Sequence, residues 1–413
     1  MNPYYLMTLL YLSLAVLAAL DTSLVNLSVL PSFPGQRWLL VHTITLGALV
    51  ELIFGLAPDL TAALSRLQRP AFRWSNWFLL NIGLIVLYAG IPLINASLII
   101  TGGALVFLAA GLLIMQLLDL VGKSGSTESK HIPSQDEGAI PSPGARFYIA
   151  GLAYLLIGVL VGTGLWLGWS EPLRIVTPKE VHVHSNLWGF ASMVLAGMLF
   201  DLYPSFTGRQ LAAPRMITPI FWLMAVGALG LVSGPWAAVD TFTVIGLVLH
   251  TIGTVLMLFI LIKPLWGKWP EWTSGVWHLI LAYVWFLLAV VVAPLVVAGG
   301  VVGAEVAGSG GPILIFGWIL QLGFALIPFL FKRSMMPEQP SRLGGTWFSL
   351  VAANGGSLLY WISLFLAAGR SPLRGVAYLL WIVSLLPIVL VLRSDLSTAL
   401  ERFRAREGGF DVR

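Results

Sequence analysis

Histidines carry most of the chemical potential of this sequence. The chain has six histidines and no cysteine, so thiolate metal sites, iron–sulfur clusters and disulfides are excluded. Two histidines begin the same spaced pattern, in which two glycines and an aspartate follow the histidine. The two patterns match at a constant offset of 142 residues: His42, Gly47, Gly55 and Asp59 against His184, Gly189, Gly197 and Asp201.

Such a pair of imidazoles could hold a metal ion or a haem iron. Neutral imidazole nitrogen ligates both, and ionisable residues inside membrane spans are rare and often functional. The alternative is that His42 and His184 each make a hydrogen bond to a neighbouring helix or to interfacial water. The glycines of the pattern would let a flat macrocycle, or a neighbouring helix, approach closely.

Two further histidines are candidate metal ligands. His182 lies two residues before His184, which is about 200° around a regular helix, so the two rings should face different neighbours. His250 lies about ten residues into its own apolar segment and is a candidate extra ligand or an interhelical contact. We expect His278, at the start of a segment, to be interfacial, and His131 to lie in a polar linker.

Glu51 is the one acidic residue near the middle of an apolar segment. It lies nine residues after His42, about 180° around the helix, so it should not reach the same ligand. A carboxylate at this depth is costly unless it is paired, protonated or hydrated. Glu51 is therefore a candidate for a proton path, or a neutral acid bonded to another helix. Asp59, Asp119 and Asp201 lie at segment ends, where we expect ordinary solvation.

The elements that position these residues are apolar helices. Hydrophobic residues make up 58% of the chain and charged residues 10%, against roughly 25% charged in a soluble domain. Continuous apolar runs of about 20 residues predict transmembrane helices. The sequence therefore predicts an all-α polytopic membrane protein that contacts the lipid bilayer and, lacking a basic stripe, no nucleic acid. The twelve predicted spans are 4–28, 38–58, 76–96, 98–120, 147–169, 182–204, 216–237, 241–265, 276–299, 312–331, 345–368 and 374–392.

The distribution of basic residues predicts the orientation. With a cytoplasmic N-terminus, 18 of the 23 lysines and arginines fall on the inner side, as the positive-inside rule requires. Both termini are then cytoplasmic, in a cell (inner) membrane. Residues 1–393 form one transmembrane domain, interrupted by a polar linker at 122–146 and followed by a charged tail at 394–413.

A third, fainter copy of the pattern surrounds Gly317. Ala325 takes the place of the second glycine, and Pro312 stands where the histidine would be. The three copies lie four spans apart. They predict three pseudo-symmetric four-helix arcs, built from residues 1–121, 147–265 and 276–393.

One motif resembles a known family. The run from His182 to Phe190, with Ala196-Gly197, Pro204 and Thr207-Gly208-Arg209, is similar to the histidine-bearing helix of the haem–copper oxidase subunit I superfamily. It is most similar to the shorter NnrS-type haem and copper membrane proteins. The resemblance implies twelve helices in three arcs and a haem, b-type, with copper as a second group near the outer face. It implies a redox, nitric-oxide-related or metal-handling role, with other respiratory or redox subunits as partners.

The chain also departs from that superfamily. Oxidases of the superfamily carry histidines on the seventh and tenth spans, and here 216–237 and 312–331 contain none. The tyrosine that follows the copper-ligating histidine in many of them is absent after His184. The resemblance therefore implies an oxidoreductase or binding protein that is not a classical oxygen reductase. A secondary transporter and a non-catalytic membrane subunit of a respiratory complex are the alternatives.

Overall fold

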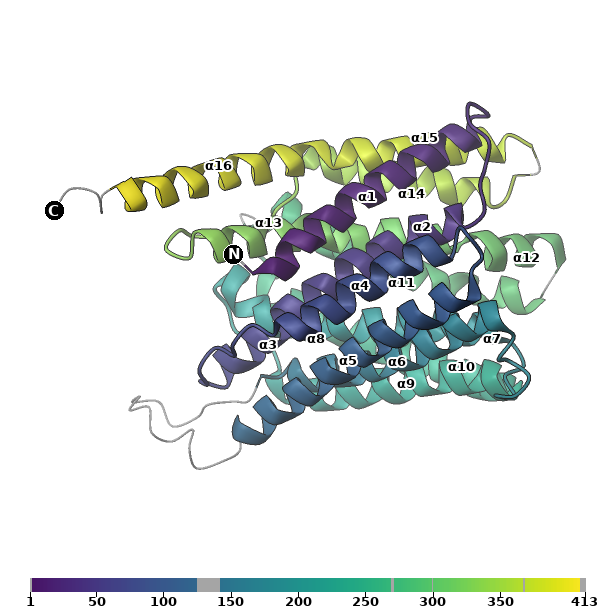
Figure 1. Ribbon diagram of the computed structural model, residues 1–413, viewed down its shortest axis with the longest axis horizontal. Helices are drawn as coiled ribbons and strands as arrows, with labels where there is room; N and C mark the ends of the chain where they lie inside the picture. The colour runs from purple at the N-terminus through teal and green to yellow at the C-terminus, as the bar shows by residue number, and fades with distance from the viewer. Residues whose placement is uncertain (1, 125–141, 269–270, 299, 367, 409–413) are drawn as a thin grey trace. The chain divides into compact units, whose positions relative to one another are not determined.

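The chain is helical throughout the part that the computed structural model describes, which is residues 2–408 apart from 125–141, 269–270, 299 and 367. Figure 1 shows these helices in chain order. The predicted linker lies largely outside the described residues, and so does the end of the tail. The helices of the first half are α1 (Pro3–Asn26), α2 (Gln36–His42), η1 (Thr43–Leu49), α3 (Val50–Leu64), α4 (Trp74–Gly90), α5 (Ala96–Ser124), α6 (Ala145–Leu167), α7 (Pro178–His184), η3 (Ser185–Ala191) and α8 (Ser192–Thr207). Those of the second half are α9 (Ile217–Ala237), α10 (Asp240–Ile262), α11 (Ser274–Ala298), α12 (Gly300–Ser309), η7 (Ile313–Leu320), α13 (Gln321–Met335), α14 (Trp347–Ser363), α15 (Arg370–Ser384) and α16 (Leu386–Gly408).

A helix stands at each of the twelve predicted spans. Within the described residues, ten helical stretches are long and apolar enough to cross a membrane. The other two, α4 and α14, have 17 residues each, which is about 26 Å of helix against a hydrocarbon core of about 30 Å. The chain is therefore an integral membrane protein with ten clear candidate spans. α12, after the ninth predicted span, was not predicted.

The chain divides into two compact units. Unit 1 contains Met1–Ser32, Gln36–Thr45 and Gly267–Arg413, and unit 2 contains Phe33–Gly35 and Leu46–Trp266. The boundary passes through the helix that begins at Gln36, so His42 belongs to unit 1 and His184 to unit 2.

Close helix contacts through glycine build unit 2. A Cβ added at Gly102 on α5 would lie 2.7 Å from Leu87 Cγ and 2.8 Å from the Gly83 carbonyl oxygen on α4. A Cβ added at Gly227 on α9 would lie 2.5 Å from the backbone nitrogen of His250 on α10. Small residues permit such approach in membranes, where dispersion between close helices replaces the hydrophobic effect.

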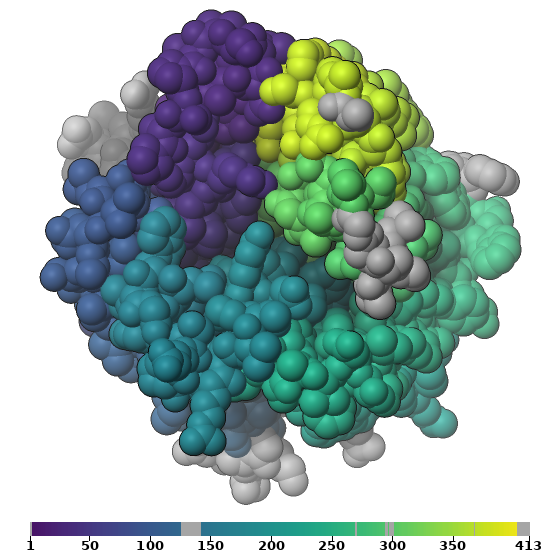
Figure 2. All heavy atoms as spheres, turned by 90° about the vertical axis from the view of Figure 1, so that its right-hand side faces the viewer, coloured from purple at the N-terminus to yellow at the C-terminus, as the bar shows by residue number. Residues whose placement is uncertain are grey.

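In unit 1 the two ends of the chain pack together. The Ser23 hydroxyl of α1 donates a 2.8 Å hydrogen bond to the Gly375 carbonyl of α15, and α1 runs alongside α15 (Figure 1). Figure 2 shows the corresponding purple and yellow surfaces in contact.

Three helices carry a π-helical segment at the same position of the repeat. These segments begin at Thr43, Ser185 and Ile313, which are 142 and 270 residues from the first. The three helical stretches that contain them are also the most buried, at 78%, 94% and 89%, against 33–44% for the other seven candidate spans. Because π-helical turns are rare and often lie at functional sites, their common register supports the internal repeat that the sequence predicted.

Candidate histidine site

His184 is the last residue of α7, directly before the π-helical segment η3. Two backbone hydrogen bonds hold the segment before α7 against the end of α9. The N–H of Val176 donates to the Trp236 carbonyl, and the N–H of Thr177 donates to the Pro235 carbonyl, both at 3.2 Å. His184 Nδ1 lies 2.6 Å from the Leu231 carbonyl oxygen on α9. Its ring also meets Trp188 edge-on at 5.3 Å.

A proline makes the Leu231 carbonyl available. In a regular helix that carbonyl would accept from the N–H four residues later, but residue 235 is Pro235, inside α9, and proline has no N–H. His184 therefore supplies the missing donor. Since a carbonyl can only accept, Nδ1 carries the proton and Nε2 is the basic nitrogen. No described residue forms a hydrogen bond with that Nε2.

His182 faces another helix. Its Nδ1 lies 2.8 Å from the Gly158 carbonyl of α6 and 3.2 Å from the Asn186 amide nitrogen. A Cβ at Gly162 would lie 2.6 Å from His182 Cε1, so the ring lies directly on α6. His182 and His184 thus point to different neighbours, as their spacing predicted.

His42 has the same kind of contact within unit 1. Its Nδ1 lies 2.8 Å from the Trp38 carbonyl oxygen one turn earlier, and its ring stacks on the Trp38 indole at 4.3 Å. His42 also directly precedes a π-helical segment, as His184 does. That the two rings face one chamber remains a prediction.

His250 contacts a backbone carbonyl through Nε2, whereas the three histidines above do so through Nδ1. Its Nε2 lies 3.2 Å from the Trp188 carbonyl oxygen in η3, and its Nδ1 lies 3.4 Å from the Thr254 hydroxyl. The side chain is 1% exposed. These contacts favour the second of the two predicted roles, an interhelical hydrogen bond.

The pattern glycines admit aromatic side chains of α6. A Cβ at Gly189 would collide with the Tyr154 ring, and one at Gly197 would lie 2.8 Å from the Tyr148 ring. Of the two predicted uses, the structure has close approach to a neighbouring helix at Gly189 and Gly197.

Glu51 lies on α3 with its side chain fully buried. Neither carboxylate oxygen meets the geometric criteria of a hydrogen bond to any described residue, although the side-chain amide of Asn81 on α4 faces it. The carboxyl group is thus buried, with the Asn81 amide facing it.

One expectation from the sequence was wrong, and His278, expected at the membrane interface, is enclosed by neighbouring side chains. Asp201 is not solvated but buried, where it accepts from the Ser142 hydroxyl and the Gly144 N–H at 2.8 Å and from the Tyr148 hydroxyl at 3.0 Å. His278 is also buried, with its Nε2 2.9 Å from the Ser349 hydroxyl. Both residues stand at segment ends, where neighbouring helices and loops cover them, which hydropathy along one segment does not show.

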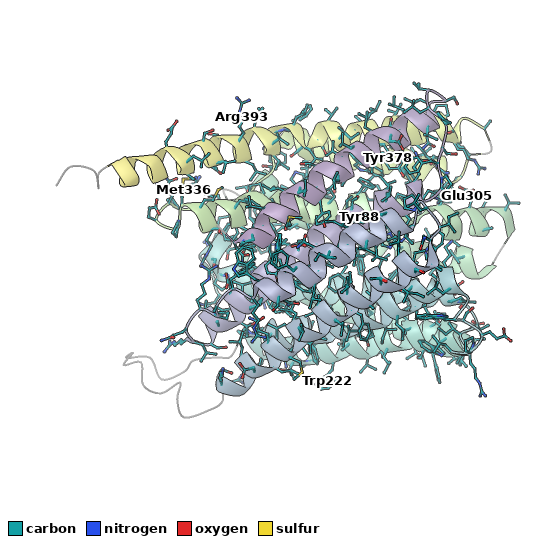
Figure 3. All side chains as sticks on the ribbon, viewed as in Figure 1. Tyr88, Trp222, Glu305, Met336, Tyr378 and Arg393 are labelled. Atoms are coloured by element: carbon teal, nitrogen blue, oxygen red, sulfur yellow. The ribbon has the colours of Figure 1, made fainter. Side chains whose placement is uncertain are left out.

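The sequence reading missed an ionic cluster in unit 1. Glu305 on α12 accepts from Arg370 at 2.7 Å and from Arg374 at 2.5 Å, both at the start of α15. The arginines are four residues apart and so share one helix face. Figure 3 shows Glu305 and Tyr378 toward one end of unit 1, and Met336 and Arg393 toward the other.

Few side chains lie together in a way that could hold a metal ion. Among the described residues, no three His, Cys, Asp or Glu side chains lie together as a metal site would require. The histidines at 42, 182 and 184 are therefore candidates for ligation singly or as a pair.

The comparisons with known proteins give no family. No protein-family model matches the sequence, and no curated protein matches it either.

Proposed function

We propose that this integral membrane protein binds b-type haem and that His184 would hold the iron through Nε2. His42, its equivalent in the repeat, is a second candidate haem ligand on the basis of its own contacts. Without cysteine the chain cannot hold haem through thioether bonds, which leaves non-covalent binding. The proposed role is redox or nitric-oxide-related, because a bound haem iron would supply one-electron chemistry and a position for a diatomic ligand.

The contact between His184 and Leu231 carries this proposal. Histidines that ligate iron or zinc commonly donate the other ring N–H to a carbonyl or carboxylate, which fixes the ring and makes the ligating nitrogen more basic. His184 has this arrangement, and His42 has the same contact with Trp38. The shared position before a π-helical segment adds to the similarity of the two residues.

The histidine contacts support a copper site less than a haem site. A copper site built from His182, His184 and His250 would need the three rings to converge. His182 contacts α6, His184 contacts α9, and His250 uses its Nε2 on Trp188. We therefore place haem before copper, and assign His250 to packing.

A secondary transporter is the second candidate. Glu51 favours it, because transporters often place a buried carboxylate near the middle of the membrane. Uptake of candidate solutes into vesicles that contain the protein would distinguish the two functions.

The experiment compares His184→Ala with His278→Ala. Both histidines are substantially buried and hydrogen-bonded, but only His184 is a proposed ligand. The Soret band and the reduced α-band of the purified protein should be lost or shifted in His184→Ala and kept in His278→Ala. Equal spectra of the two variants would overturn the assignment.

A further inference from the structure

We propose that Glu51 is a proton-binding site inside the membrane, reached through buried polar side chains from the end of the span where α3 leads into α4. The proposal concerns proton uptake and does not depend on haem. It rests on the burial of Glu51, on the polar groups that follow it along α3 and α4, and on its position in the repeat.

The carboxyl group of Glu51 is buried and poorly solvated. Glu51 is 0% exposed, and neither of its oxygens accepts a well-formed hydrogen bond from a described residue, the Asn81 amide being the polar group that faces it. An ionised carboxylate without a partner is strongly unfavourable in such surroundings. A neutral carboxylic acid is far less costly, and it gives this position a proton to hold and exchange.

Buried polar side chains follow Glu51 along α3 and α4 toward the end of the span. Thr61 lies ten residues farther along α3, about 15 Å by helix rise, and its buried hydroxyl has no hydrogen-bond partner among the described residues. Asn76, near the start of α4, is 2% exposed, and its side-chain oxygen also has no such partner. Asn81, five residues farther along α4, faces Glu51.

Unpartnered polar groups are uncommon in folded interiors. Here Glu51, Thr61 and Asn76, on the consecutive helices α3 and α4, leave such groups, and the buried amide of Asn81 on α4 faces Glu51. Water that bridges these groups would satisfy them and would carry protons between the span end and the carboxyl group. A purely structural carboxylic acid would not require unpartnered groups at Thr61 and Asn76.

The internal repeat has a second buried polar side chain at the position equivalent to Glu51. Gln321 follows Glu51 by 270 residues, which is the spacing of the π-helical segments at Thr43 and Ile313. Both side-chain polar atoms of Gln321 are buried without a partner among the described residues, like those of Glu51. The repeat thus places a polar side chain at this position twice, and of the two only the carboxyl group of Glu51 is titratable.

The charged side chains on α5, α6 and α8, which pack against α3, interact with groups other than Glu51. Asp119 and Lys123 on α5 pair with each other at 2.8 Å. Asp201 on α8 is bound by its three donors, and Arg146 on α6 lies over the rings of Phe147 and Phe221. The tyrosines Tyr148 and Tyr154 on α6 donate to Asp201 and to the Ala225 carbonyl, and Tyr203 on α8 packs on Phe206.

The test is infrared spectroscopy of the full chain in lipid vesicles. The wild type should show the carbonyl band of a protonated carboxylic acid at neutral pH, and Glu51→Gln should lack it. Asp119→Asn, which changes an exposed carboxyl group at a span end, should keep it. Transfer to D₂O should shift the band within minutes if the group exchanges with solvent.

The path is tested by the double variant Thr61→Val, Asn76→Leu. This variant should keep the band but slow its shift in D₂O at least tenfold. A second probe, labelling by a hydrophobic carbodiimide followed by mass spectrometry, should modify Glu51 in the folded wild type. Absence of the band and of labelling at neutral pH would overturn proton binding, and unchanged exchange in the folded double variant would overturn the path.

Discussion

The imidazole of His184 takes the hydrogen bond that Pro235 cannot make. His184 Nδ1 lies 2.6 Å from the Leu231 carbonyl, which in a regular helix would accept from the backbone nitrogen of residue 235. One proline in α9 thus fixes the tautomer and direction of a histidine on another helix. The arrangement leaves Nε2 as the basic nitrogen, which is the basis of the proposed haem site.

Restoring the missing N–H should weaken that site. In Pro235→Ala the new N–H of residue 235 would compete with His184 for the Leu231 carbonyl, while His184 itself stays in place. Loss of such a supporting contact typically costs about 10–100-fold in ligand affinity. We expect haem retention, measured by titration, to fall by a factor in that range.

The matched control is Pro58→Ala, which changes an internal helix proline on α3. It should leave haem retention unchanged. Equal haem affinity in the wild type and Pro235→Ala would show that the Leu231 contact does not position a ligand.

Exogenous imidazole should rescue the loss of the ligand. In His184→Ala the removed ring leaves space beside α9, and a free imidazole can enter and coordinate iron in its place. We expect the Soret band to return with millimolar imidazole. No return of the band in a folded His184→Ala protein would argue against direct ligation.

Asp201 should contribute strongly to stability. Its carboxylate accepts from Ser142, from Tyr148 and from the Gly144 N–H beside the start of α6. In Asp201→Ala three buried donors would lose their acceptor, at a cost of about 2–4 kcal/mol in the free energy of unfolding. Thermal unfolding followed by tryptophan fluorescence should show a clearly lower melting temperature.

Asp119→Ala is the comparison for Asp201→Ala. Asp119 makes an exposed ion pair with Lys123, which is worth about 0.3–0.5 kcal/mol. Similar melting temperatures for the two variants would contradict the structural role of Asp201.

The contact between α4 and α5 predicts opposite effects for two glycines of one helix. Gly102→Ala places a methyl group against Leu87 and the Gly83 carbonyl, and such overpacking costs about 1–3 kcal/mol. Gly111→Ala meets nothing within 4 Å and should stabilise α5 by about 0.5–1 kcal/mol. Melting temperatures of the two variants should therefore move in opposite directions.

The Glu305 cluster predicts a pH dependence. The hydrogen bond from Arg374 lowers the pKa of the Glu305 carboxyl below its ordinary value of 4.5, helped by the Ser309 side chain and by the charges of Arg374 and Arg370. A lowered pKa means that the ionised form stabilises the fold. That stabilisation is present above pH 4.5 and is lost as the pH falls through the lowered pKa.

Glu305→Gln should therefore be less stable than the wild type near pH 7, and the difference in melting temperature should shrink below pH 4.5. Glu338→Gln, which removes an exposed pair with Arg402, should show a much smaller difference. A difference for Glu305→Gln that does not change with pH would contradict the ionic contact.

The sequence predicted the helices well, because hydropathy and the absence of charge are local properties. Helices stand at all twelve predicted positions, and the three π-helical segments, which the sequence did not predict, share the register of the repeat. α12 was missed because Gly300–Ser309 has few features that separate it from a loop. The burial of Asp201 and His278 depends on neighbours far along the chain, which no single segment reveals.

The site was predictable only in part. The spacing of His182 and His184 correctly indicated different neighbours. The role of Pro235 requires knowing that α9 passes beside His184, although a proline inside an apolar segment does signal an available carbonyl. The pairing of Glu305 with Arg370 and Arg374 depends on α12, which the sequence did not predict.

The haem content of the purified wild-type protein tests the central claim most directly. Its absorption spectrum, oxidised and dithionite-reduced, should show a Soret band and b-type α-band, and conversion to the pyridine complex should give about one haem per chain. A folded protein with no Soret band, even after incubation with haem, would contradict the account.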